Sequence, residues 1–131
     1  KNNKSMKAKK EIRELTKAEL QIMQLLWKKD QAFVNELIEE MQEPKPAYNT
    51  VSTIVRILEK KGFVSHKTFG KSHQYFPIVE REIYLKSYMG NMLSSFFSGS
   101  VSNMVSFLSK KEGITLKEAD EIMEIISKSK T

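Results

Sequence analysis

The sequence contains no cysteine, which excludes several kinds of site at once. A disulfide framework, a thiolate metal site and a cysteine nucleophile are all ruled out. No apolar run approaches the roughly 20 residues that a membrane-spanning helix needs. The first ten residues are basic and lack the apolar stretch of a secretory signal. We therefore expect a cytoplasmic protein that does not insert into a membrane.

The sequence also lacks the patterns on which most enzymes depend. It has only five glycines, none of them in a phosphate-binding loop, and no serine lies in a nucleophile-elbow sequence. His66 and His73 fall short of the three or four ligands that zinc needs, and no carboxylate lies between them in the sequence. These absences predict a protein that is not an enzyme and that uses no metal and no cofactor.

Positive charge is in excess and unevenly placed. The 131 residues include 22 lysines and arginines against 16 acidic residues, for a net charge of +6. No acidic residue occurs between Glu59 and Glu80, a window that contains four lysines and both histidines. An unneutralised basic stretch of this kind is typical of surfaces that bind phosphate or acidic lipid.

The spacing of apolar residues predicts three helices over the first part of the chain. A capping box of Thr16 and Glu19 opens the first helix. The second covers about residues 34–41 and is stopped by two prolines. The third begins after Pro46 and ends near residue 61, ahead of Gly62.

A β-hairpin is predicted next, from two short β-prone runs at residues 63–68 and 73–76 around a connection that contains Gly70. Three helices followed by a β-ribbon form the layout of a winged helix-turn-helix domain. We therefore expect a mainly α fold with a small β-hairpin. The predicted parts are a flexible basic arm (1–14), a winged-helix DNA-binding domain (15–78) and a helical dimerisation domain (79–131).

The dimerisation domain is inferred from three amphipathic helices, the last opened by a second capping box of Thr115 and Glu118. So small a unit has too little interior to bury its apolar faces alone, and a second copy of the chain would cover them. The alternative is that these helices fold back onto the first domain. The predicted interface residues are Tyr84, Tyr88, Met92, Val101, Met104, Val105, Leu108, Ile122 and Ile126.

The third helix has the composition of a DNA-reading helix. Its apolar residues cluster on one side, and short hydrogen-bonding residues and cations lie on the other. Threonine can contact a thymine methyl, asparagine can pair with adenine, and arginine can bind guanine or phosphate. The predicted base contacts are Asn49, Thr50, Ser52 and Thr53. The predicted backbone contacts are Tyr48 (which has the alternative of capping the local core), Arg56, Lys60, Lys67 and Lys71.

The sequence resembles the penicillinase-repressor family, the group that includes BlaI, MecI and CopY. The resemblance is carried by residues 15–23 with Leu26-Trp27, residues 49–55, 58–64 and 75–77, Gly99-Ser100 and Met104-Val105. It implies a homodimeric transcriptional repressor with a winged helix and a helical dimerisation domain. Members bind inverted-repeat operators before β-lactam-resistance genes, and cleavage triggered by a membrane sensor-protease relieves repression. By this resemblance Asn49, Thr50 and Thr53 contact bases, and Arg56, Lys67 and Lys71 contact the backbone.

The sequence departs from the family pattern in two places. The copper-responsive branch carries a cysteine-rich tail, which this chain lacks, so copper sensing is excluded. The antibiotic-responsive branch has an Asn-Phe scissile bond, whereas the corresponding stretch here contains Val105, Ser106, Phe107 and Leu108. Two other functions stay open at this point. One is a winged-helix module that binds an acidic protein, and the other is a repressor that binds a small ligand directly.

Overall fold

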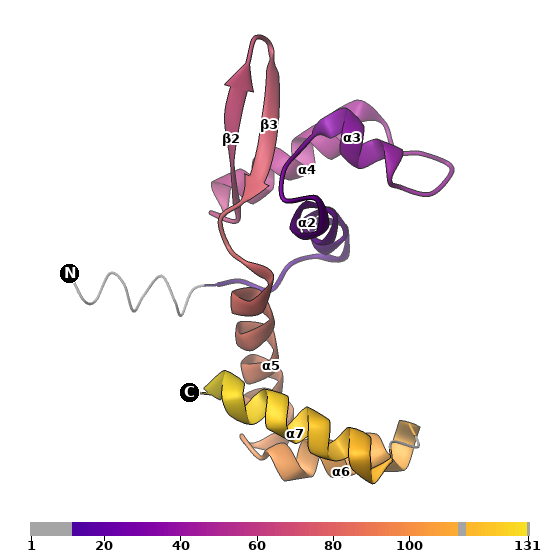
Figure 1. Cartoon of the computed structure of the whole chain (residues 1–131), viewed down its shortest axis with the longest axis vertical. Coiled ribbons are helices and arrows are strands. Elements are labelled where there is room, and N and C mark those ends of the chain that lie inside the picture. Colours follow the sequence, from indigo (N-terminus) through magenta and orange to yellow (C-terminus); the bar gives the residue numbers. More distant parts are fainter. Residues whose placement is uncertain (1–11, 113–114, 131) are drawn as a thin grey trace, which may run out of the picture. The chain divides into compact units, whose positions relative to one another are not determined.

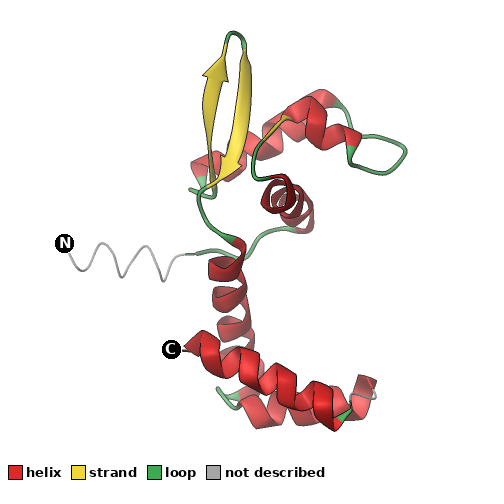
Figure 2. Ribbon diagram, in the orientation of Figure 1, coloured by secondary structure: helices red, strands yellow, loops and turns green. Residues whose placement is uncertain are grey.

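The computed structural model describes residues 12–112 and 115–130, which form two compact units, one up to Arg81 and one from Glu82 onward (Figure 1). Helices dominate both units, and the only strands among the described residues form a small antiparallel sheet (Figure 2). The predicted fold class is therefore confirmed. The first unit contains α2 (Lys17–Lys29), β1 (Ala32–Phe33), α3 (Val34–Glu39), α4 (Tyr48–Lys60), β2 (Val64–Phe69) and β3 (Ser72–Pro77).

The predicted hairpin forms from β2 and β3, paired in register from Val64 opposite Pro77 to Phe69 opposite Ser72. Its turn is shorter than the sequence predicts, because Phe69 and Ser72 belong to the strands. The sheet also has a third strand that was not predicted. β1 pairs antiparallel with β3, with Ala32 opposite Tyr75, and this places β3 in the centre of the sheet. A strand of two residues is too short to show an alternating pattern.

The core of the first unit lies between the helices and the base of the hairpin. One side of α4 supplies Val51, Val55 and Leu58, each almost fully buried, as the helical spacing predicts. The base of the hairpin adds Val64 and Tyr75. Because one face of α4 is fixed in this core, its opposite face is held outward.

The helix ends show which local predictions hold. The capping box at the start of α2 is confirmed, with the Glu19 N–H donating to Thr16 Oγ1 at 3.1 Å and the Thr16 N–H donating to Glu19 Oε1 at 3.0 Å. Gly62 ends α4 with φ +85°, a conformation that favours glycine. α3 ends at Glu39, two residues earlier than predicted. The ammonium of Lys45 satisfies carbonyls at that end, including the oxygen of Met41 at 2.6 Å.

The second unit contains α5 (Arg81–Phe97), α6 (Val101–Glu112) and α7 (Leu116–Lys130). Between α5 and α6, Ser98 and Gly99 have positive φ, and the Gly99 N–H donates to the Leu93 carbonyl at 3.0 Å. The capping box predicted at Thr115 and Glu118 is confirmed. Leu93 and Met104 form the buried centre of this unit, with Met89, Met92, Phe97, Val101, Leu108 and Ile122 packed around them. None of the described helices is long and apolar enough to cross a membrane.

Candidate nucleic-acid interface

The outward face of α4 carries the residues that the sequence predicts to read DNA. Asn49, Thr50 and Thr53 are exposed, and Ser52 is half-buried at the edge of the face. Tyr48 is 53% exposed, so part of its side chain is accessible to a DNA backbone. The first turn of α4 contains no acidic residue, and Ala47 at its N-cap position makes no side-chain hydrogen bond to the helix. The positive end of the helix dipole at this terminus therefore favours an anion.

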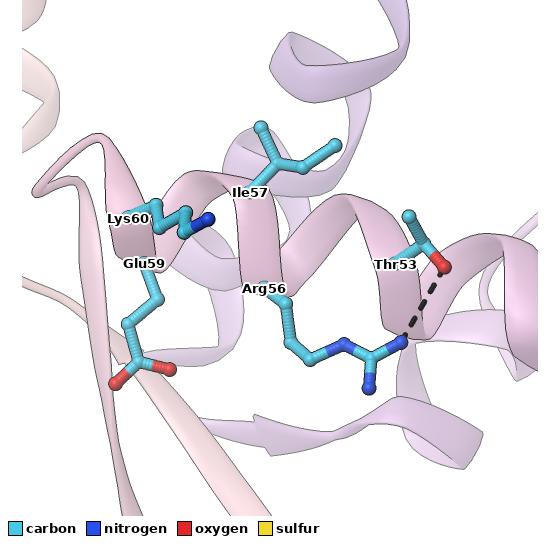
Figure 3. Close-up of a pocket in the computed structure, with 5 residues that line it drawn as sticks. All are labelled: Thr53, Arg56, Ile57, Glu59 and Lys60. Atoms are coloured by element: carbon cyan, nitrogen blue, oxygen red, sulfur yellow. Dashed lines mark hydrogen bonds between the residues drawn. The ribbon is translucent and has the colours of Figure 1, made fainter.

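A shallow hollow of about 490 Å³ lies on the same face, lined by Thr53, Arg56, Ile57, Glu59 and Lys60 (Figure 3). Arg56 Nη2 donates a long hydrogen bond of 3.5 Å to Thr53 Oγ1. This contact is at the outer limit for a hydrogen bond, and it leaves the guanidinium free to exchange it for a phosphate or a base.

Four cations predicted to contact the DNA backbone are available for that role. Arg56, Lys60, Lys67 and Lys71 are all exposed, and none forms an ion pair with a residue that the structure describes. The ammonium of Lys67 lies 5.9 Å from the centre of the Phe76 ring, at the outer limit of a cation–π contact. By contrast, Lys61 from the same basic window is occupied internally.

Lys61 links the C-terminal end of α4 to the start of α2 through an ion pair with Glu19. Its ammonium lies 2.8 Å from Glu19 Oε2, and Glu19 is only 5% exposed. Burial opposes the ionisation of Glu19, but the hydrogen bond from Lys61 and the bonds from Thr16 outweigh it and hold the pKa of Glu19 below its ordinary value. The pair fixes the C-terminal end of α4 against the start of α2, and so orients the outward face.

The two histidines lie together at the junction of α4 and the hairpin. Their rings are stacked, with centroids 4.1 Å apart and planes 9° apart. His66 Nδ1 lies 2.9 and 3.0 Å from the carboxylate oxygens of Glu59. A carboxylate therefore contacts His66, although it comes from α4 and not from the sequence between the two histidines. Nowhere in residues 12–112 and 115–130 do three metal-ligating side chains gather.

Tyr75 packs against this junction from β3. Its ring centroid lies 5.5 Å from that of His66. Burial raises the pKa of Tyr75, and the negative charge of Glu59 adds to the effect, while Arg56 opposes it. The raised pKa favours the neutral phenol, which suits its buried place beside the His66 ring.

Most of the residues predicted to form the dimer interface are buried or partly buried within one chain. Met92, Val101, Met104, Leu108 and Ile122 belong to the core of the second unit. Val105 and Tyr84 are also buried, and Tyr88 stacks on Tyr84 but remains exposed. The side chain of Ile126 lies outside the described residues. Besides Tyr88, the large apolar side chains that are exposed in the described part of this unit were not predicted to form the interface: Ile83, Phe96, Phe107, Met123 and Ile125, with Phe96 78% exposed.

The four residues at the predicted cleavage region all lie inside α6. Val105 is buried, Leu108 is half-buried, and Ser106 and Phe107 are exposed. Phe107 packs against Phe97 of α5, with ring centroids 5.8 Å apart. A protease that binds an extended segment therefore requires α6 to unwind locally before cleavage.

Three residues near the candidate interface were missed by the sequence analysis. Ile57 lies on the outward side of α4 although it is aliphatic, and it is 39% exposed. Glu59 contacts His66, and Phe69 at the hairpin tip packs edge-on against Phe33 of β1 at 5.9 Å. Only Ile57 could have been found from the helical spacing alone, as an apolar residue outside the buried stripe.

The profile of the family described as "Penicillinase repressor" matches residues 15–128. The methicillin resistance regulatory protein MecI of Staphylococcus aureus (strain N315) is 30% identical over 116 residues, which cover 88% of this chain and 94% of MecI. The penicillinase repressor of Bacillus licheniformis is 26% identical over 122 residues, 92% of this chain and 95% of that protein.

Among solved structures, the solution structure of the DNA-binding domain of the repressor BlaI matches with 29% identity and a TM-score of 0.49, covering 56% of this chain and 92% of that domain. The family profile extends over most of the chain, and the relative from S. aureus aligns along nearly its whole length. This chain belongs to the penicillinase repressor family, whose members are transcriptional repressors and not enzymes.

Proposed function

We propose that this protein is a DNA-binding repressor of β-lactam-resistance genes that acts as a homodimer on an inverted-repeat operator. The observation that carries the proposal is the outward face of α4, where exposed Asn49, Thr50 and Thr53 are followed by Arg56 and Lys60. A helix with hydrogen-bonding residues near its N-terminal end and cations further along suits the major groove. Membership of the penicillinase repressor family supports the same function.

In this proposal the residues divide into two roles. Asn49, Thr50, Ser52 and Thr53 contact base edges and determine which sequence is bound. The exposed cations of α4 and the hairpin, together with Tyr48, contact sugar and phosphate and so set the register of the protein on the duplex. The hairpin contributes Lys67 and Lys71 to this second group, and no acidic residue of β2 or β3 opposes them.

The second unit joins two such DNA-binding units. Its core is small and is centred on Leu93 and Met104, while several large apolar side chains among the described residues of the same unit remain exposed. Covering Phe96 and Phe107 with a second copy would bury apolar surface that one chain leaves exposed. A dimer makes the second half-site contact intramolecular and raises the apparent affinity by roughly 10²–10⁴.

Release is proposed to follow cleavage in α6, by a membrane sensor-protease of the kind that the family resemblance implies. The exposed pair Ser106 and Phe107 is the accessible part of the candidate segment, and Val105 is the part that must first leave the core. Cutting here separates Met104 from Leu108 in the core of the unit. The DNA-reading face of α4 is untouched, so repression ends through loss of avidity.

Footprinting on the DNA upstream of the protein's own gene tests the proposal. We expect protection of two inverted half-sites with centres one or two helical turns apart, about 34–36 Å per turn. Sedimentation should give a dimer at the concentrations that footprint. A protein that protects no sequence in preference to unrelated DNA would contradict the repressor function. In that case the hypothesis to test would be binding to an acidic protein or to a small ligand.

A further inference from the structure

The outward face of α4 is divided lengthwise into a polar and an apolar side. The hydroxyl of Thr53 accepts the hydrogen bond from Arg56, and Figure 3 shows the Thr53 methyl turned to the other side of the helix, the side that carries Ile57. Arg56 and Glu59 extend from the opposite side in the same view (Figure 3). The Thr53 methyl and Ile57 therefore form an apolar strip beside the polar residues.

Ile57 does not serve the core, because the buried stripe of α4 consists of Val51, Val55 and Leu58. A single exposed isoleucine is ordinary on a protein surface. Its setting is not ordinary, since it lines the hollow on this face together with Arg56 and Lys60. The strip lies beside Arg56 and Lys60, two cations that form no ion pair with the described residues, and such a surface is complementary to a polyanion that carries an apolar group.

Duplex DNA presents such a group in the major groove, the C5 methyl of thymine. We propose that Ile57 and the methyl of Thr53 contact thymine methyls in each half-site, and that Ile57 is a further specificity-determining residue of this repressor. The proposal rests on the proposed function. A protein partner is less consistent with this face, because the strip is narrow and the cations beside it need counter-charges.

The helix geometry fixes how far apart the two thymines lie. Residues four apart on a helix have Cβ atoms about 5–6 Å apart. Neighbouring bases along one strand of a duplex are about 3.4 Å apart. Thr53 and Ile57 therefore reach thymines one or two base steps apart, and each half-site should contain such a pair.

Replacing thymine by deoxyuridine tests the proposal, because it removes only the methyl group. Each thymine of the footprinted operator is replaced in turn, symmetrically in both half-sites, and the affinity is measured by gel shift. Burial of one methyl corresponds to roughly a fourfold change in affinity, and two half-sites together to roughly 15-fold. We expect losses of this size at two thymine positions one or two steps apart.

Two variants then assign the two positions. Ile57→Ala should bind the unmodified operator roughly 15-fold more weakly, by the same methyl arithmetic, and should be indifferent to deoxyuridine at one position. Thr53→Ser removes the methyl and keeps the hydroxyl, and it should be indifferent at the other. Ile78→Ala is the matched control, since Ile78 is 54% exposed in the same unit and lies outside α4. It should keep the wild-type affinity and the loss of affinity caused by deoxyuridine at each of the two positions. Circular dichroism checks that all variants fold.

The outcomes distinguish a failure of this proposal from a failure of the proposed repressor function on which it rests. If Ile57→Ala retains the full deoxyuridine penalty at every position, Ile57 reads no thymine methyl. A wild-type protein that binds its operator tightly yet tolerates every deoxyuridine substitution overturns the proposal and leaves the repressor function standing. If Ile57→Ala instead abolishes the dimer in sedimentation, the strip belongs to a protein interface. A wild-type protein without preference for its own upstream DNA overturns both.

Discussion

The hairpin lysines offer a direct test of how much of the binding is electrostatic. Each subunit has four exposed cations that form no ion pair with the described residues: Arg56, Lys60, Lys67 and Lys71. A dimer would then neutralise about eight phosphates. Each neutralised phosphate contributes about −0.9 to the slope of log affinity against log salt, so the expected slope is about −7.

Replacing Lys67 and Lys71 together by alanine removes half of these contacts. The slope should flatten to about −3.6, because about four phosphates remain neutralised. The difference is large in a titration: each doubling of salt should weaken the wild type roughly 150-fold and the double variant roughly 12-fold. Fluorescence anisotropy with a labelled operator at several KCl concentrations measures both slopes. The order of preference among operators should be unchanged, since phosphate contacts carry no sequence information.

Lys45→Ala is the matched control, because the Lys45 ammonium already donates to three carbonyls at the end of α3. It should alter stability and leave the slope at about −7. A double variant whose slope stays within about one unit of the wild type would refute the assignment of the hairpin to the DNA backbone. A Lys45→Ala variant that flattens the slope would show instead that the surface beyond α3 meets the DNA.

Three further predictions concern stability and assembly. Glu19→Gln should lower the free energy of unfolding at pH 7 by about 1–3 kcal/mol, measured by urea denaturation. Because the folded pKa of Glu19 is depressed, its contribution is present above the ordinary pKa of 4.5 and is lost as pH falls below it, so wild type and variant should converge in acid. Gly62→Ala should lower the free energy of unfolding by about 1–2 kcal/mol, because Gly62 has φ +85° and no atom lies near enough to clash. Gly90→Ala inside α5 should instead raise it by about 0.5–1 kcal/mol. Changes of the same sign in the two variants would refute this conformational argument. A chain truncated after Val105 should sediment as a monomer and bind operator at least 100-fold more weakly, and a fully active dimer would contradict release by uncoupling.

Local chemistry made part of this fold predictable from the sequence. The capping boxes at Thr16 and Thr115 and the stop at Gly62 depend on residues within a few positions of one another, so their pattern is sufficient. The hairpin follows from two β-prone runs around Gly70. The buried stripe of α4 follows from helical spacing, and its opposite face follows with it.

The features that were missed depend on contacts between elements. β1 has two residues and exists because β3 offers a free edge to Ala32 and Phe33. The meeting of Glu59 with His66 requires the turn after α4 to fold the hairpin back against the helix, which no pattern in the sequence reports. The same holds for Lys61, which looks like one more DNA-binding lysine until Glu19 is found 2.8 Å away.

The second unit shows why the sequence alone cannot separate the residues of a dimer interface from those of the core of one chain. An apolar stripe indicates that a face is buried, but it does not say whether the same chain or a second copy buries it. Here the stripe residues Met92, Val101 and Leu108 surround the core of one chain. Phe96 and Phe107 lie outside that core and are exposed, so they are the better candidates for contact between copies. A unit with so small a core should lose much of its stability when the partner leaves, and we expect dissociation and the unwinding of α6 to promote each other.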